Sequence, residues 1–155
     1  FSGYWKKPEI TTEMMRDGWL HTGDGGTMDA EGYVVFGSRL KELIRRGGEM
    51  ISPAEIELEL LKHPSVRDCA VVGVPDDILG DEIKAVVVVA SGDPDAIDLR
   101  SFLECRIAAH MLPRYFEFCD AIPKTETEKI KRHELIIAGP NLIDLKTTPT
   151  KETHR

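Results

Sequence analysis

Two short β-branched runs constrain the fold of this chain more than any other feature. The runs "CAVVGV" (69–74) and "IKAVVVVA" (83–90) are bounded by turn residues and predict strands that are buried on at least one face. A further run, "YFEF" (115–118), predicts a third strand. Together with the helical segments described next, the order helix, strand, strand, helix, strand predicts an α+β domain with a sheet of about three strands packed by helices.

The segment "SPAEIELELLKHP" (52–64) carries the clearest helix signals. Ser52 can cap the helix, Pro53 suits its first position, and Glu55 completes a capping box. The helix is expected to stop near Lys62, because the residue before Pro64 is pushed toward extended geometry. A second helix is predicted in "IDLRSFLECRIAAHM" (97–111), with Asp98 as its cap and an apolar face at helical spacing formed by Leu99, Phe102, Leu103 and Ile107.

The two ends of the chain lack this alternation of helix and strand patterns. Residues 17–37 hold six glycines and a short β-rich run, Tyr33 to Phe36, which predict hairpins with tight turns at Asp-Gly and Glu-Gly. A domain boundary is expected near Arg39 to Glu42. Residues 139–155 are predicted to be an irregular tail, apart from an apolar patch at Leu142 to Leu145.

Length, charge and cysteines exclude several classes of protein. A chain of 155 residues suits one domain, or one small domain plus part of another, and this one is expected to be a piece of something longer. The net charge of −7 argues against nucleic-acid binding, and no apolar run approaches the ~20 residues of a membrane helix. Three widely spaced cysteines, Cys69, Cys105 and Cys119, suggest neither disulfides nor a zinc site. We expect a reducing cytoplasm, with Cys69 and Cys119 as buried, inert thiols.

Three motifs hold residue types suited to chemistry. In "GWLHTGD" (18–24), the carboxylate of Asp24 could accept hydrogen bonds from vicinal hydroxyls such as those of ribose, although an aspartate that simply ends a turn is the commoner case. The segment "GSRLKELIRRGGEMISPAEIE" (37–57) joins an arginine, a possible pivot and a glycine pair to the capped helix, and the glycines by themselves indicate a tight turn or a close backbone approach. The run "PKTETEKIKR" (123–132) holds four cations, and such runs are usually solvated surface.

In this order and spacing, the motifs closely resemble the C-terminal part of the adenylate-forming enzymes, over roughly residues 1–138. This family includes acyl-CoA synthetases, peptide-synthetase adenylation domains and firefly luciferase. The resemblance implies a small, mobile C-terminal domain (41–138), preceded by the end of a large N-terminal domain (1–40). It also implies that the full-length enzyme activates a carboxylic acid with ATP and Mg²⁺ to an acyl-adenylate, and then transfers the acyl group to coenzyme A.

The resemblance also implies roles for individual residues. Asp24 and Arg39 would bind the ribose, and Lys41 would be the hinge of the mobile domain. The turn of Gly47, Gly48 and Glu49 would line the tunnel for the pantetheine arm of coenzyme A.

The last family motif, Pro-Lys-Thr-x-Thr-Gly-Lys, implies that Lys129 is the catalytic lysine of adenylation. An ammonium on a long side chain could stabilise the two anions that meet when a carboxylate attacks the α-phosphorus. Lys124, Lys131 and Arg132 are predicted to be solvated. Glu128 stands where the family has glycine, so we expect no left-handed backbone there. The "TEK" and "LIRRGGEMIS" segments resemble most the branch around crotonobetaine/carnitine-CoA ligases.

Two alternatives stay open from the sequence. The parent protein could load a carrier protein instead of coenzyme A, or this part could be an interaction module that kept the fold and lost the chemistry. The phosphate loop and the acyl pocket of the family lie in its N-terminal domain, so these residues are expected to bind no cofactor or metal and to be inactive alone. The acyl substrate is therefore not predicted.

Overall fold

The chain is divided into two compact units. The computed structural model describes residues 1–92 and 94–146, and the division between the units falls between Lys41 and Glu42. This position lies within the segment where the sequence predicts a boundary.

The first unit consists of one helix and two separate hairpins, and every one of its residues is at least partly exposed. Its elements are α1 (Pro8–Met14), β1 (Met15–Arg16), β2 (Trp19–Leu20), β3 (Asp24–Met28) and β4 (Val34–Arg39). β1 pairs with β2 across an Asp17-Gly18 turn in which both residues have positive φ, and β3 pairs with β4 across a turn that contains Glu31-Gly32. The hairpin predictions are thus confirmed, whereas α1 was not foreseen.

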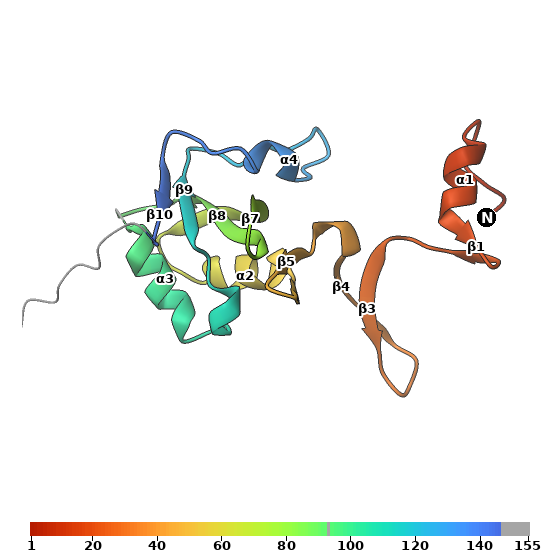
Figure 1. Ribbon diagram of the computed structural model, residues 1–155, viewed down its shortest axis with the longest axis horizontal. Helices are drawn as coiled ribbons and strands as arrows, with labels where there is room; N and C mark the ends of the chain where they lie inside the picture. Colours follow the sequence, from red (N-terminus) through yellow and green to blue (C-terminus); the bar gives the residue numbers. More distant parts are fainter. Residues whose placement is uncertain (93, 147–155) are drawn as a thin grey trace, which may run out of the picture. The chain divides into compact units, whose positions relative to one another are not determined.

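The second unit is a mixed α and β domain (Figure 1). The 3₁₀ turn η1 (Leu40–Glu42) spans the division between the units. The elements that follow are β5 (Ile44–Arg46), β6 (Glu49–Ile51), α2 (Pro53–Leu60), β7 (Val66–Asp76), β8 (Gly80–Val89), α3 (Ala96–Glu104), η2 (Ala109–Met111), β9 (Tyr115–Phe118), α4 (Arg132–Leu135) and β10 (Leu142–Asp144).

Six strands form one sheet in this unit, with the order β10-β9-β8-β5-β6 and with β7 paired to β8. β7 and β8 make a long antiparallel hairpin, while β8 and β9 run parallel. The α+β class is confirmed and the three predicted strands are present, but the sheet is larger than expected. β5, β6 and β10 have three residues each, too few for a periodic pattern in the sequence.

The apolar patch that the sequence sets apart within the irregular tail forms a strand, β10. Ile143 pairs with Phe116 of β9, and it packs with Leu145 against the core. A fork of hydrogen bonds from Arg114 to Asp144, 2.8 and 2.6 Å long, fixes the strand further. Residues 147–155 of the predicted tail lie outside the described residues.

The core is split between the two faces of the sheet because side chains alternate along β8. Ile83, Ala85 and Val87 face a cluster that includes buried residues of α2 and α3. Val86 and Val88 face a second cluster that includes Ile122 and Leu135. In Figure 1, α2 and α3 accordingly lie on one side of the sheet and α4 lies on the other.

α2 begins where the sequence predicts it, whereas α3 begins at Ala96, before the predicted cap, and ends at Glu104, short of the predicted face residue Ile107. The Ser52 side chain makes no capping bond, and its carbonyl instead accepts a hydrogen bond from the Glu55 backbone N–H at 3.3 Å, so the predicted capping box is wrong. The N-cap of α3 is Asp95 and not Asp98. The two residues form a capping box: the Asp95 carboxylate accepts a hydrogen bond from the Asp98 N–H, and the Asp98 carboxylate accepts one from the Asp95 N–H. α2 ends at Leu60, slightly before the predicted Lys62.

Candidate functional site

Asp24 and Arg39 face each other in the first unit. They are paired across the β3–β4 hairpin, and the Arg39 Nε atom lies 3.3 Å from the Asp24 Oδ1 atom. The side chains are 33% and 57% exposed for Asp24 and Arg39 respectively, so both can reach a ligand while they hold one another in place. The hairpin register therefore brings together the two residues for which the resemblance implies ribose binding.

Lys41 lies in η1, at the end of the first unit. The next residue, Glu42, begins the second unit and places its carboxylate 3.2 Å from the Nε atom of Arg132.

Gly47 and Gly48 form the two-residue turn between β5 and β6. Their φ angles are +59° and +89°, which side chains with a Cβ rarely adopt, so the turn requires glycine at both positions. The Gly47 N–H donates to the Leu79 carbonyl at 2.9 Å and ties this turn to the neighbouring β7–β8 turn. Glu49 follows as an exposed residue at the start of β6.

Lys129 lies in a small hairpin that spans residues 124–130. Lys124 and Ile130 form an antiparallel bridge, and the Thr125 N–H donates to the Lys129 carbonyl at 2.8 Å. The Lys129 N–H donates to the Thr125 hydroxyl at 3.2 Å. Lys129 is exposed, and within the described ranges its ammonium has no hydrogen bond or ion pair. The backbone is therefore fixed while the ammonium can reach a ligand.

The expectation of an ordinary backbone at Glu128 is wrong. Glu128 has a φ of +61°, in the left-handed region, and its N–H closes the turn by donating to the Thr125 carbonyl at 3.0 Å. The hairpin geometry thus demands the conformation that glycine would adopt freely, and the glutamate adopts it under strain.

Two of the three cations predicted to be solvated are held by carboxylates from elements distant in the sequence. The Lys124 ammonium lies 2.7 Å from Asp68, and this bond, with a smaller contribution from the charge of Glu128, raises the pKa of Lys124. Arg132 is largely buried and binds Glu57 and the Val71 carbonyl as well as Glu42. Lys131 pairs only with Glu134 and stays partly exposed.

Lys84 is a buried charged residue that the sequence analysis did not single out. It is 1% exposed, and its ammonium donates to the carbonyls of Leu135 and Ile137 at 2.7 and 2.8 Å. Glu117 of β9 lies 2.5 Å from the same ammonium. A lysine inside the β-branched run "IKAVVVVA" was the available signal, because a buried charge in a strand requires a partner.

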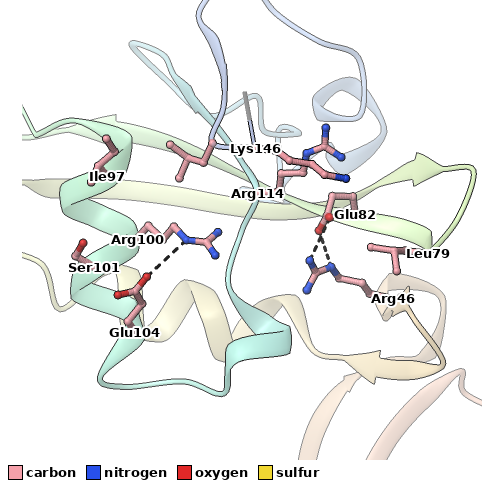
Figure 2. Close-up of a pocket in the computed structure, with 10 residues that line it drawn as sticks. Arg46, Leu79, Glu82, Ile97, Arg100, Ser101, Glu104, Arg114 and Lys146 are labelled. Atoms are coloured by element: carbon pink, nitrogen blue, oxygen red, sulfur yellow. Dashed lines mark hydrogen bonds and ion pairs between the residues drawn. The ribbon is translucent and has the colours of Figure 1, made fainter. Parts of the chain in front are cut away.

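A cleft of about 540 Å³ lies beside α3 and the β5–β6 turn (Figure 2). Its three guanidinium groups are all engaged with carboxylates: Arg46 with Glu82, Arg100 with Glu104, and Arg114 with Asp144. These three pairs neutralise one another, and the Lys146 side chain lines the cleft as well; the lining does not define a class of ligand.

Cys69, Cys105 and Cys119 are free cysteines. Burial, with smaller contributions from the charges of Glu57 and Asp68, raises the pKa of Cys69 to about 12, so the thiol is buried, as predicted, and its ionisation is disfavoured. Cys119 is half-buried and Cys105 is exposed. Over residues 1–92 and 94–146, no helix is long and apolar enough to cross a membrane, and no group of three or more His, Cys, Asp or Glu side chains could hold a metal ion.

Comparison with known proteins places this fold in a family. The family model of the AMP-binding enzyme C-terminal domain matches residues 55–129. A feruloyl-CoA synthase from Amycolatopsis is 47% identical over 134 residues, which are 86% of this chain and 27% of that protein. The fatty acid–[acyl-carrier-protein] ligase ScoC from Streptomyces coeruleorubidus is 44% identical, over 85% of this chain and 26% of the relative.

A solved structure shares the arrangement of the elements. The o-succinylbenzoate CoA synthetase of Bacillus subtilis, in complex with its acyl-adenylate intermediate, matches with a TM-score of 0.82 and 33% identity, over 88% of this chain and 28% of that one. Residues 55–129 therefore belong to the AMP-binding enzyme C-terminal domain family, and the relatives of the chain are acyl-CoA synthetases and ligases of the adenylate-forming superfamily.

The chain spans about a quarter of the length of these curated relatives, 27% and 26%. None of the three proteins named here is a crotonobetaine/carnitine-CoA ligase, and membership of that branch stays a prediction.

Proposed function

We propose that this chain is the C-terminal portion of an ATP-dependent acyl-CoA ligase. The observation that carries the proposal is the family match together with the Lys129 hairpin, which presents an exposed ammonium on a backbone fixed by hydrogen bonds. The partner of this portion is its own large N-terminal domain, and its substrate is a carboxylic acid.

Asp24 and Arg39 bind the ribose of ATP in this proposal. The carboxylate accepts hydrogen bonds from the two ribose hydroxyls, and the guanidinium donates to the same sugar. Their pairing across one hairpin supports these roles, because the ion pair holds both side chains in one orientation before the nucleotide arrives.

Lys129 stabilises the transition state of adenylation. A carboxylate oxygen forms a bond to the α-phosphorus while the bond from phosphorus to the pyrophosphate oxygen breaks, so negative charge accumulates between two anions. An ammonium placed between them lowers the barrier without transferring a proton. The second half-reaction, in which the thiol of coenzyme A attacks the acyl carbon and AMP leaves, does not need this ammonium.

The swing between half-reactions is proposed to occur at Lys41. The division between the compact units next to this residue supports the proposal, because few contacts oppose rotation at such a junction. The Gly47-Gly48 turn, with Glu49, then lines the pantetheine tunnel. We assign no residue of this chain to the Mg²⁺ that accompanies ATP.

The variant Lys129→Ala tests the proposal in the full-length protein. Pyrophosphate release is measured with ATP and the acids named in the relatives: ferulate, a fatty acid and o-succinylbenzoate. The variant should lose adenylation by about 100-fold or more, the usual effect of removing a charge-stabilising group. Thioester formation from supplied acyl-adenylate should stay within about threefold of wild type, as should both half-reactions of the control Lys131→Ala.

Two outcomes would reject the proposal. Equal loss of both half-reactions in Lys129→Ala would remove the assigned role of Lys129. No pyrophosphate release by the wild-type protein with any carboxylate would favour the non-catalytic interaction module.

A carrier protein is the second candidate acceptor. The 44% identity to the acyl-carrier-protein ligase ScoC favours it. Supplying coenzyme A and a phosphopantetheinylated carrier protein in parallel separates the two acceptors, and we expect thioester on coenzyme A.

The free thiols support the expectation of a reducing compartment such as the cytoplasm.

A further inference from the structure

Arg132 joins three elements of the second unit. Its NH1 atom donates to the Glu57 carboxylate of α2 at 2.6 Å and to the Val71 carbonyl of β7 at 2.7 Å, and NH2 donates to the other Glu57 oxygen at 3.2 Å. Nε donates to Glu42 at 3.2 Å. The fork to Glu57 is largely shielded from water, with 21% of the Arg132 side chain and 13% of the Glu57 side chain exposed.

The position of Arg132 in the chain gives this network a consequence. It lies three residues after Lys129, at the first position of α4, a helix of four residues that is too short to be stable by itself. The orientation of the Lys129 hairpin therefore depends on what anchors its flanks. Lys124 binds Asp68 on one flank, while Arg132 and the buried Lys84 hold the other.

Of the three anchoring residues Lys124, Lys84 and Arg132, Arg132 is the one that binds a residue next to the proposed hinge, Lys41. The carboxylate that binds Arg132 Nε belongs to Glu42, the residue directly after Lys41. Glu42 is 43% exposed, so this bond can be remade when the backbone of η1 changes, whereas the shielded fork to Glu57 persists.

We propose that Arg132 is a positioning residue for adenylation, which orients the Lys129 hairpin and couples its orientation to the hinge through Glu42. The inference rests on the proposed function of Lys129. Glu57 and Val71 supply the fixed part of the anchor, and Glu42 supplies the part that responds to the hinge.

Arg132→Lys and Glu42→Gln test the two parts in the full-length protein, with the carboxylate that gives the fastest pyrophosphate release. Arg132→Lys keeps the charge and loses the fork. It should lower kcat for adenylation by about 10- to 100-fold, the effect of displacing a catalytic group by about 1 Å, with KM values and thioester formation from supplied adenylate within about twofold. Glu42→Gln should lower the same kcat by about threefold and add nothing to Arg132→Lys in the double variant.

Arg114→Lys is the matched control. The Arg114 side chain is 19% exposed and makes a comparable fork, to Asp144 of β10, which does not directly flank the 124–130 hairpin. A purely structural role for Arg132 predicts that both arginine variants lower melting temperature and both half-reactions alike, and this result would overturn the proposal. Full additivity of Glu42→Gln and Arg132→Lys would overturn the coupling to the hinge.

Hydrogen exchange of residues 124–130 provides a readout without catalysis. The amides of Glu128 and Lys129 are bonded inside the hairpin, and their exchange should accelerate by about tenfold or more in Arg132→Lys but not in Arg114→Lys. If Lys129→Ala leaves adenylation intact while Arg132→Lys still accelerates exchange, the role of Lys129 fails and the anchoring by Arg132 stands. Unchanged exchange in Arg132→Lys would reject the anchoring itself.

Discussion

Glu128 shows how one backbone angle can be demanded by a turn against the preference of the side chain. Its φ of +61° closes the Thr125 turn, and the Thr125 carbonyl and hydroxyl accept the N–H groups of Glu128 and Lys129. A residue with a Cβ atom costs about 1–2 kcal/mol in this region. The glutamate therefore stores strain directly beside the proposed catalytic lysine.

We predict that Glu128→Gly stabilises the protein. Relief of the left-handed strain outweighs the larger backbone entropy of glycine in the unfolded chain, so the free energy of unfolding should rise by about 0.5–1 kcal/mol. Denaturant titration measures this change. Adenylation should change while thioester formation from supplied adenylate should not, because the proposed role of Lys129 belongs to adenylation alone.

Glu126→Gly is the matched control in the same hairpin. Glu126 is exposed, as Glu128 is, but its φ is not positive, so glycine there should lower the free energy of unfolding by up to about 1 kcal/mol. If both variants destabilise the protein equally, the left-handed strain at Glu128 is refuted.

Arg132 marks the limit of residue-level prediction. The pattern of "PKTETEKIKR" predicts solvated charge, and at Arg132 this is wrong because Glu57 and Glu42 come from segments 75 and 90 residues away. Burial acts to lower the pKa of Arg132, but the bonds with these carboxylates outweigh it and raise the pKa above its ordinary value. A local sequence pattern does not predict ion-pair partners that lie so far away in the chain.

At the scale of elements, the hydrophobic pattern of the sequence predicted the strands of the buried core. The runs 69–74 and 83–90 are the centres of β7 and β8, and 115–118 is β9. The short elements escaped because tertiary contacts stabilise them: β10 exists through its pairing with β9 and through Arg114. The glycine turns were foreseen because their φ angles leave little choice of residue.

The anchoring of β10 by Asp144 predicts a dependence of stability on pH. Hydrogen bonds from Arg114 lower the pKa of Asp144 below its ordinary value, against the opposing effect of burial. The ion pair therefore stabilises the native state above the unfolded pKa near about 3.9, and the contribution is lost as the pH falls through the lower native pKa. Asp144→Asn should reduce the free energy of unfolding by about 1–2 kcal/mol at neutral pH.

Denaturant titrations between about pH 2 and pH 7 measure this effect, since the difference between Asp144→Asn and wild type should close below about pH 4. Asp77→Asn serves as control, because Asp77 is exposed in the β7–β8 turn and makes no ion pair with the described residues. A difference that persists unchanged at pH 2 would contradict the ionic origin of the anchoring.

At the scale of the whole molecule, the two units differ in what holds them together. All buried apolar residues of the described chain lie at or after Ile44, in the second unit. The first unit buries none and exposes large side chains, including Trp5, Trp19, Val34, Val35 and Phe36. Such surface is typical of a segment that packs on a partner, which supports the proposal that residues 1–41 complete a larger domain.

The separation of the units next to Lys41 leads to a prediction for the full-length enzyme. A proline at this position fixes φ near about −65° and restricts Leu40 as well, so Lys41→Pro should favour one of the two conformations that the half-reactions require. One half-reaction should then fall at least about tenfold more than the other. Pyrophosphate release and thioester formation from supplied adenylate, measured separately, report the two half-reactions.

Lys41→Ala removes the same ammonium but leaves the backbone free to rotate, and it should keep both half-reactions within about threefold of wild type. Equal loss of both half-reactions in Lys41→Pro would count against a swing at this residue, and equal loss in the alanine variant would show that the side chain, and not the backbone, is what the enzyme needs there.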